Sequence, residues 1–164
     1  SGPSLRLYIS LNHSVYKVNY KIIKLIENEK RWGVKKILKY KNFNKKVIKN
    51  THKLKKLILE KYNSGFKIGC FSAPAKGNTL LNFLNLDKKI ISSVCENNKL
   101  KIGKYTPGTH IKIVNDENYL NKNIDYSLLL SWNYKNFFVA NSIYFKKGGK
   151  FIIPFPKPTI ITNE

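Results

Sequence analysis

Short apolar runs separated by turns and helical segments fill the chain after Gly65. The uninterrupted apolar stretches within 127–130 and 151–153 fit strands that are buried on both faces, as in parallel sheets covered by helices. The pattern predicts an α/β fold with a mostly parallel sheet flanked by helices. The expected strands are Lys67–Phe71, Ile90–Val94, Ile111–Val114, Tyr126–Ser131, Lys150–Ile153 and Thr159–Thr162. The expected helices between them are Thr79–Leu86 and Lys135–Phe145.

The segment before Gly65 has a different texture. Alternating apolar residues predict a strand over Pro3–Ser10, and apolar residues at helical spacing predict helices over Val15–Trp32 and Asn42–Tyr62. The 42% hydrophobic content of the 164 residues is enough for one core. We therefore expect a single domain, in which residues 1–64 are a strand and two helices that lead into an α/β core over 65–164.

The chain is strongly basic, with 31 Lys and Arg against 9 Asp and Glu, a net charge of +22. Such a charge attracts nucleic acid, acidic membranes or phosphorylated metabolites. The basic residues are nearly all lysines scattered among Asn and Ile, which indicates a compositional bias, and the sequence has no RNA-binding motif. We therefore expect no nucleic-acid partner, and a basic nucleic-acid-binding module remains an alternative that rests on charge alone.

Several features concern location and chemistry. The sequence has neither an apolar run of about 18 residues nor a secretory signal, so we expect a cytoplasmic protein without a membrane partner. It contains no methionine, so we expect it to be a piece of a longer protein or a processed chain. Cys70 and Cys95 lie in apolar runs without a C-x-x-C motif, and we expect buried free thiols and no metal site.

The stretch from Gly69 to Asn82 predicts an anion site. An apolar strand breaks into a turn of small residues that ends in Lys76-Gly77-Asn78-Thr79 and opens a helix. The first N–H groups of a helix have no partner within it, and beside a lysine they suit a phosphate. Because Pro74 and Ala75 stand where a dinucleotide-binding turn has glycines, we expect no dinucleotide binding of the kind found in dehydrogenases.

Other polar and aromatic residues follow the expected strands. Glu96 ends the second strand, where a carboxylate can accept from a ribose hydroxyl, or merely cap the strand or pair with a lysine. Tyr105 and His110 flank a Thr-Pro-Gly turn that can hold a ligand, although turn formation alone would explain the presence of these residues. Trp132 and Asn133 follow the fourth strand. Because carboxyl ends of parallel strands share one edge, we expect a common cradle for a negatively charged metabolite. No arrangement typical of a catalytic site emerges.

Five segments in order resemble one known family: Gly2–Tyr8, Ala73–Asn82, Lys101–Ile111, Leu130–Asn133 and Gly148–Pro156. The sequence is similar to the C-terminal domain of S-adenosylmethionine-dependent C-methyltransferases that act on nucleotide-linked deoxysugars, over nearly the whole chain. The resemblance implies a Rossmann-like domain that helps hold a nucleotide diphosphate-sugar. Glu96 stands where the family usually has Asp, which keeps the carboxylate and lengthens its reach.

The resemblance also implies that other parts of such an enzyme lie upstream. These would be a cysteine-rich zinc module and a methyl-donor domain that binds S-adenosylmethionine and carries the Glu-His pair associated with proton abstraction. We therefore expect no catalytic residue and no cofactor in this chain, and no methyl transfer by it alone. The matched loops bind the substrate on one interpretation and only seat the methyl-donor domain on another. On a third interpretation, the chain is a non-catalytic structural remnant.

Overall fold

The computed structural model describes residues 5–163 and divides into two units, one through Ile48 and one from Lys49 onward. The first unit holds helix α1 (Tyr20–Trp32). The side chain of Asn19, directly before the helix, accepts from the N–H of Lys21, and Gly33, directly after the helix, has a φ of 89°. Helix α2 (Ile37–Asn63) starts in the first unit and continues into the second. Both expected helices are confirmed, although α1 begins later than Val15 and α2 begins earlier than Asn42.

The expected amino-terminal strand is wrong for its described part. Residues 5–10 form no strand, and Pro3 and Ser4 lie outside the described residues. Leu5, Leu7 and Ile9 are 66%, 61% and 91% exposed. A strand is stable only when its backbone pairs with a neighbour, and alternation along a segment does not supply that neighbour.

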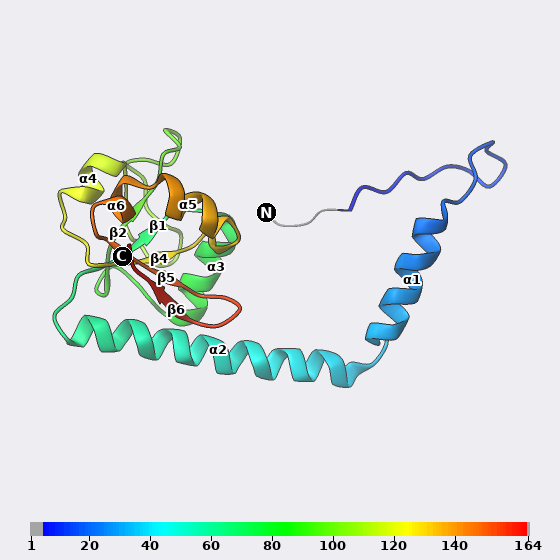
Figure 1. The fold of residues 1–164 in the computed structure, drawn as a ribbon, viewed down its shortest axis with the longest axis horizontal. Coiled ribbons are helices and arrows are strands. Elements are labelled where there is room, and N and C mark those ends of the chain that lie inside the picture. The colour runs from blue at the N-terminus through cyan, green and yellow to red at the C-terminus, as the bar shows by residue number, and fades with distance from the viewer. Residues whose placement is uncertain (1–4, 164) are drawn as a thin grey trace. The chain divides into compact units, whose positions relative to one another are not determined.

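The second unit is built on a six-stranded sheet in the order β3-β2-β1-β4-β5-β6. Figure 1 labels β1, β2, β4, β5 and β6 of this sheet. The strands are β1 Ile68–Phe71, β2 Ile91–Cys95, β3 Ile113–Val114, β4 Tyr126–Leu129, β5 Lys150–Ile153 and β6 Thr159–Ile161. Strands β1 to β5 are parallel, and β6 is antiparallel to β5. The strand order reverses between β1 and β4, which makes their carboxyl ends the topological switch point.

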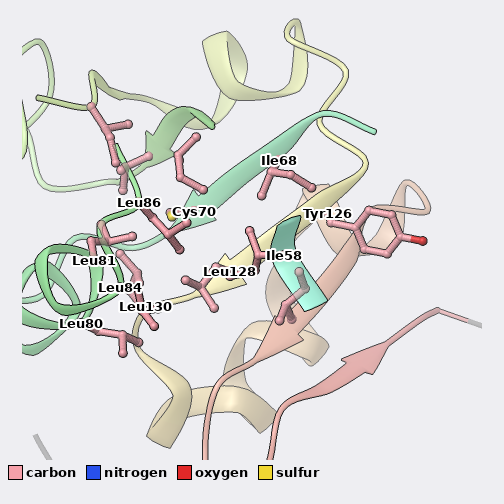
Figure 2. Packing of buried hydrophobic residues seen from close by; sticks show 14 of the residues in the cluster. Ile58, Ile68, Cys70, Leu80, Leu81, Leu84, Leu86, Tyr126, Leu128 and Leu130 are labelled. Atoms are coloured by element: carbon pink, nitrogen blue, oxygen red, sulfur yellow. The ribbon is translucent and has the colours of Figure 1, made fainter. Parts of the chain in front are cut away.

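Helices cover both faces of this sheet, as the sequence predicts. On one face, the second half of α2 and helix α3 (Ala75–Leu84) pack their apolar residues on alternate positions of the strands (Figure 2). On the other face lie α4 (Asp116–Leu120), α5 (Lys135–Asn141) and α6 (Ile143–Lys146), around a cluster rich in aromatic rings. Cys70 and Cys95 are buried free thiols, as expected.

Two short-range features depart from the expected helices. The expected helix over Lys135–Phe145 is interrupted at Ser142, whose extended backbone ends α5 and whose hydroxyl accepts from the N–H of Phe145 to begin α6. Helix α4 was not expected, since five residues are too few to show a helical period. Among the helices of residues 5–163, none combines the length and apolar character that a bilayer crossing requires.

Candidate functional site

Side chains from three loops at the carboxyl edge of the sheet meet around Trp132. The ammonium group of Lys76 lies 4.3 Å from the centroid of the Trp132 ring and donates to the side-chain oxygen of Asn133. The Phe155 ring, from the loop after β5, lies 5.0 Å from Trp132. Partial burial lowers the pKa of Lys76 below its ordinary value. We call Lys76, Trp132, Asn133 and Phe155 the rim cluster.

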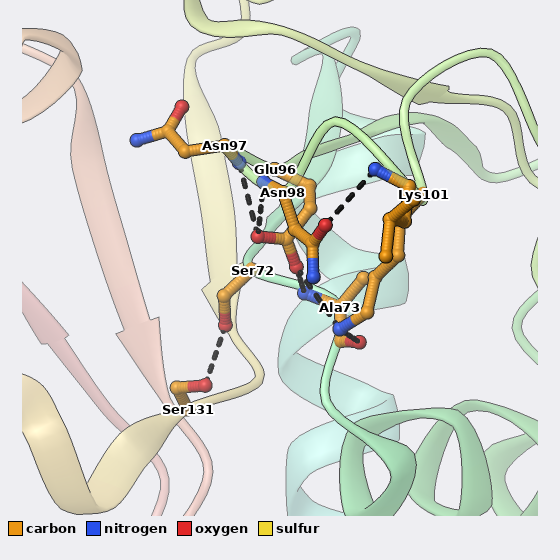
Figure 3. A network of polar contacts seen from close by, with 8 residues as sticks. Ser72, Ala73, Glu96, Asn97, Asn98, Lys101 and Ser131 are labelled. Atoms are coloured by element: carbon orange, nitrogen blue, oxygen red, sulfur yellow. Dashed lines mark hydrogen bonds and ion pairs between the residues drawn. The ribbon is translucent and has the colours of Figure 1, made fainter.

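A hydroxyl pair joins β1 and β4 at the same edge. Ser72 directly follows β1 and Ser131 follows β4 after Leu130, and the hydroxyl oxygens of the two serines are 2.7 Å apart (Figure 3). Ser72 has a φ of 64°, a left-handed conformation that is uncommon for serine, while its N–H donates to the carbonyl of Cys95. Hydroxyl groups are therefore fixed at the switch point, with Ser131 directly before Trp132 of the rim cluster in the chain.

The turn before α3 differs from the expected anion site in one respect. Helix α3 begins at Ala75 instead of Thr79, and the N–H groups of Gly77 and Asn78 already donate to the carbonyl of Pro74. Pro74 provides no capping side chain, so the helix end is formed by the backbone of Ala75 and Lys76. The candidate anion site thus lies earlier in the chain than the sequence indicates.

Gly77, Asn78 and Thr79 have different environments in α3. A Cβ at Gly77 would lie 2.6 Å from the Cβ of Leu130, so glycine permits close approach of α3 to β4. The Asn78 side-chain oxygen is buried and has no hydrogen-bond partner in the described residues. The Thr79 hydroxyl lies 3.4 Å from the carbonyl of Ala75 and is otherwise exposed.

Glu96 ties two loops together (Figure 3). One carboxylate oxygen accepts from the N–H of Ala73, and the other accepts from the N–H groups of Asn97 and Asn98. The Lys101 ammonium lies 3.5 Å from Glu96 and donates to the carbonyl of Ala73 at 2.8 Å. Burial raises the pKa of Glu96, but these backbone donors and Lys101 outweigh it and hold the pKa below its ordinary value. Both carboxylate oxygens are therefore engaged by the protein itself, which favours the structural interpretation of Glu96.

The loop that carries Tyr105 and His110 contacts the other end of α3. The Asn82 side chain donates to the carbonyl of Pro107, and the N–H of Lys88 donates to the carbonyl of Thr109. Tyr105 and His110 are both exposed. The recorded contacts of this loop within residues 5–163 do not include the rim cluster, so the structure brings Lys76, Trp132 and Asn133 together without Tyr105 and His110.

Two hollows lie at the opposite, amino edge of the sheet. One, of about 560 Å³, is lined by residues that precede β4 and β5, including Ile124 and Gly149. The other, of about 360 Å³, is lined by residues around the starts of β1 and β2. The rim cluster lies at the edge away from both hollows, with Lys76, Trp132 and Phe155 half-buried and Asn133 exposed. In the described residues, no three His, Cys, Asp or Glu side chains gather as metal ligands would.

Sequence reasoning named the loops at the carboxyl edge but did not choose three of their residues as site residues. Ser72 and Ser131 form the hydroxyl pair, and Phe155 packs on Trp132. All three follow strands, which was the available signal. Neither the left-handed backbone of Ser72 nor a ring contact between loops 23 positions apart leaves a local pattern in the sequence.

Comparisons with known proteins show which family the chain belongs to. A family model described as the C-methyltransferase C-terminal domain matches residues 1–156. The chain is also 27% identical, over 164 residues, to the C-methyltransferase NovU of Streptomyces niveus. That match covers 99% of this chain and 39% of NovU, so the chain spans well under half the length of this relative. The chain belongs to the C-methyltransferase C-terminal domain family.

Proposed function

We propose that this chain is the substrate-positioning domain of an S-adenosylmethionine-dependent C-methyltransferase that acts on a nucleotide-linked deoxysugar. The observation that carries the proposal is the meeting of Lys76, Trp132 and Asn133 at the point where the strand order reverses. Ligands of open α/β sheets bind outside the carboxyl ends of the strands at such a point. Family membership supplies the context of a C-methyltransferase.

The chemistry of the rim cluster suits a nucleotide diphosphate-sugar. The Lys76 ammonium and the start of α3 offer positive charge to a diphosphate. The Trp132 and Phe155 rings offer an aromatic surface to a base or to the apolar face of a deoxysugar, and the Asn133 amide offers hydrogen bonds. These groups bind and orient; none of them is a base placed to remove a proton from carbon.

The zinc site, the S-adenosylmethionine site and the proton-abstracting residues belong, on this proposal, to other parts of the enzyme. The rim cluster lies outside both recorded hollows, so a neighbouring domain would complete the site over it. Helix α1 has an apolar stripe and no buried residue, with Ile22, Ile23 and Ile26 39%, 55% and 45% exposed. We assign this stripe to packing against the methyl-donor domain.

Calorimetric titration of the chain with a nucleotide diphosphate-sugar tests the proposal. Lys76→Ala is expected to weaken binding about tenfold, the effect of losing one charged contact of roughly 1.4 kcal/mol. Lys146→Ala removes the same charge from an exposed position of α6 and is the matched control, expected to bind like the parent. Equal affinities of the two variants would contradict the proposed site. With S-adenosylmethionine added, the chain alone is expected to transfer no methyl group.

A further inference from the structure

The hollow of about 360 Å³ at the amino edge of the sheet combines aromatic rings with lysines. It lies between the end of α2 and the starts of β1 and β2, and its lining includes Tyr62, Phe66, Lys67, Lys88 and Lys89. Because the strands are parallel, this edge is opposite to the edge that carries the rim cluster. We call these five residues the amino-edge groove.

The rings of the groove are held in place by the protein. The Tyr62 hydroxyl donates to the carbonyl of Lys89 at 3.1 Å, which ties the end of α2 to the turn before β2. The Phe66 ring packs edge-on against Tyr126 at 5.2 Å between centroids. Tyr62 and Phe66 nevertheless remain 41% and 37% exposed, so part of each ring is open to a ligand.

Two further lysines lie near Phe66 and the neighbouring buried ring of Tyr126. The Lys61 ammonium lies 5.8 Å from the centroid of Phe66 and 5.3 Å from that of Tyr126. Lys150, at the start of β5, approaches Tyr126 to 5.1 Å. Aromatic faces attract cations, so the fixed rings help hold the ammonium groups at this edge of the sheet.

Among the described residues, the nearby carboxylates form no recorded ion pair with the groove lysines and are outnumbered by them. Asp87 accepts from the backbone N–H of Lys89, and Asp125 accepts from the backbone N–H of Lys67. The Lys67 ammonium lies 3.4 Å from the carbonyl of Lys122, which leaves its charge unpaired with an acid. In the part of the chain that the structure describes, the recorded ion pairs are Lys56–Glu60 and Lys101–Glu96, and neither includes a groove lysine.

We infer that the amino-edge groove binds nucleotides, either free or as part of a single strand. Exposed rings offer stacking to a base of any type, and adjacent lysines pair with the phosphates. This combination is what proteins use for single strands without sequence preference. The inference does not rest on the proposed sugar-nucleotide function, because it concerns other residues at the other edge of the sheet.

Fluorescence anisotropy of a labelled ten-nucleotide thymidine strand tests the inference on the whole chain. The triple variant K67E/K88E/K89E reverses the charge of the three groove lysines, and K99E/K104E/K112E makes the same change in net charge on exposed lysines of the 97–112 loop. At about 0.15 M salt, we expect the groove variant to bind at least tenfold more weakly than the control variant. Phe66→Leu is expected to weaken binding about fivefold through lost stacking.

Salt titration and competition complete the test. Loss of three phosphate contacts should reduce the magnitude of the negative slope of log affinity against log salt by about 2, and only in the groove variant. Displacement of the strand by excess thymidine monophosphate identifies a free nucleotide as the ligand, and failure to displace it identifies the strand. Equal weakening by the two triple variants, or no binding by the parent chain, overturns the inference. Circular dichroism melts verify that each variant is folded, and a Lys→Gln series at the same six positions replaces any that is not.

Discussion

The Lys76 ammonium lies 4.3 Å from the centroid of the Trp132 ring, so the start of α3 and the loop after β4 share one cation–aromatic contact. The pKa of Lys76 is lowered by burial, and a lower pKa gives a larger neutral fraction at alkaline pH. Because only the neutral amine reacts with acylating reagents, we expect Lys76 to be among the first lysines acetylated at about pH 9. Peptide mass mapping after brief treatment measures this. Modification of Lys76 no faster than the mean of the other lysines would contradict it.

The Glu96 carboxylate is expected to make stability depend on acid pH. Its pKa is held below the ordinary glutamate value, so its contribution is present above the unfolded-state pKa of about 4.3 and is lost as the pH falls through the folded-state pKa. Glu96→Gln should lower the unfolding free energy by about 1–3 kcal/mol at pH 7 and flatten its decline below about pH 4.3. Urea unfolding at several pH values measures both effects.

The variant Lys101→Met is the control for Glu96→Gln. It removes the ammonium but keeps the three backbone donors to the carboxylate, so we expect it to retain most of the acid dependence. A variant Glu96→Gln that titrates like the parent would show that this carboxylate does not tie the two loops together in solution.

The close approach of α3 to β4 depends on glycine at position 77. A Cβ there would lie 2.6 Å from the Cβ of Leu130, so the helix must shift. We expect Gly77→Ala to lower the unfolding free energy by about 1–3 kcal/mol, although alanine is the better helix former. Thr79→Ala, two positions along the same helix on an exposed site, is the control and should change it by less than about 0.5 kcal/mol. A stabilised Gly77→Ala protein would refute the packing described.

The left-handed backbone of Ser72 separates two effects of substitution. Ser72→Gly and Ser72→Ala both lose the hydroxyl pair with Ser131, but only alanine keeps a Cβ at a φ of 64°. We expect the alanine variant to be less stable than the glycine variant by about 1 kcal/mol. Thermal unfolding of the two proteins measures the difference, and the reverse order would mean that the residue does not hold this conformation.

Much of the fold could be predicted because local patterns and packing agree in the second unit. The run Lys150–Ile153 coincides with β5 as expected, since a strand buried on both faces leaves a continuous apolar signal. The strand predicted over residues 5–10 is wrong because alternating apolar residues form a strand only where a neighbouring strand pairs with them. The break at Ser142 depends on the capping hydroxyl of this one residue. Because the apolar residues on both sides of Ser142 keep helical spacing, the sequence pattern predicts one continuous helix.

The site was harder to predict than the fold because it depends on how loops fold back. Trp132 and Asn133 follow a central strand closely, so their position was fixed by the strand itself and they meet Lys76. Tyr105 and His110 belong to a longer loop, which packs on the far end of α3 through Asn82. The sequence marks that loop as a rigid turn but not the direction in which it folds.

The most direct test of the proposed substrate site is chemical-shift mapping by nuclear magnetic resonance of the ¹⁵N-labelled chain titrated with a nucleotide diphosphate-sugar. The account predicts the largest changes at the backbone N–H of Lys76 and Asn133 and at the indole N–H of Trp132, with saturation at one common ligand concentration. Changes confined to the residues of the amino-edge groove, or no change at these three groups at millimolar ligand, would contradict it.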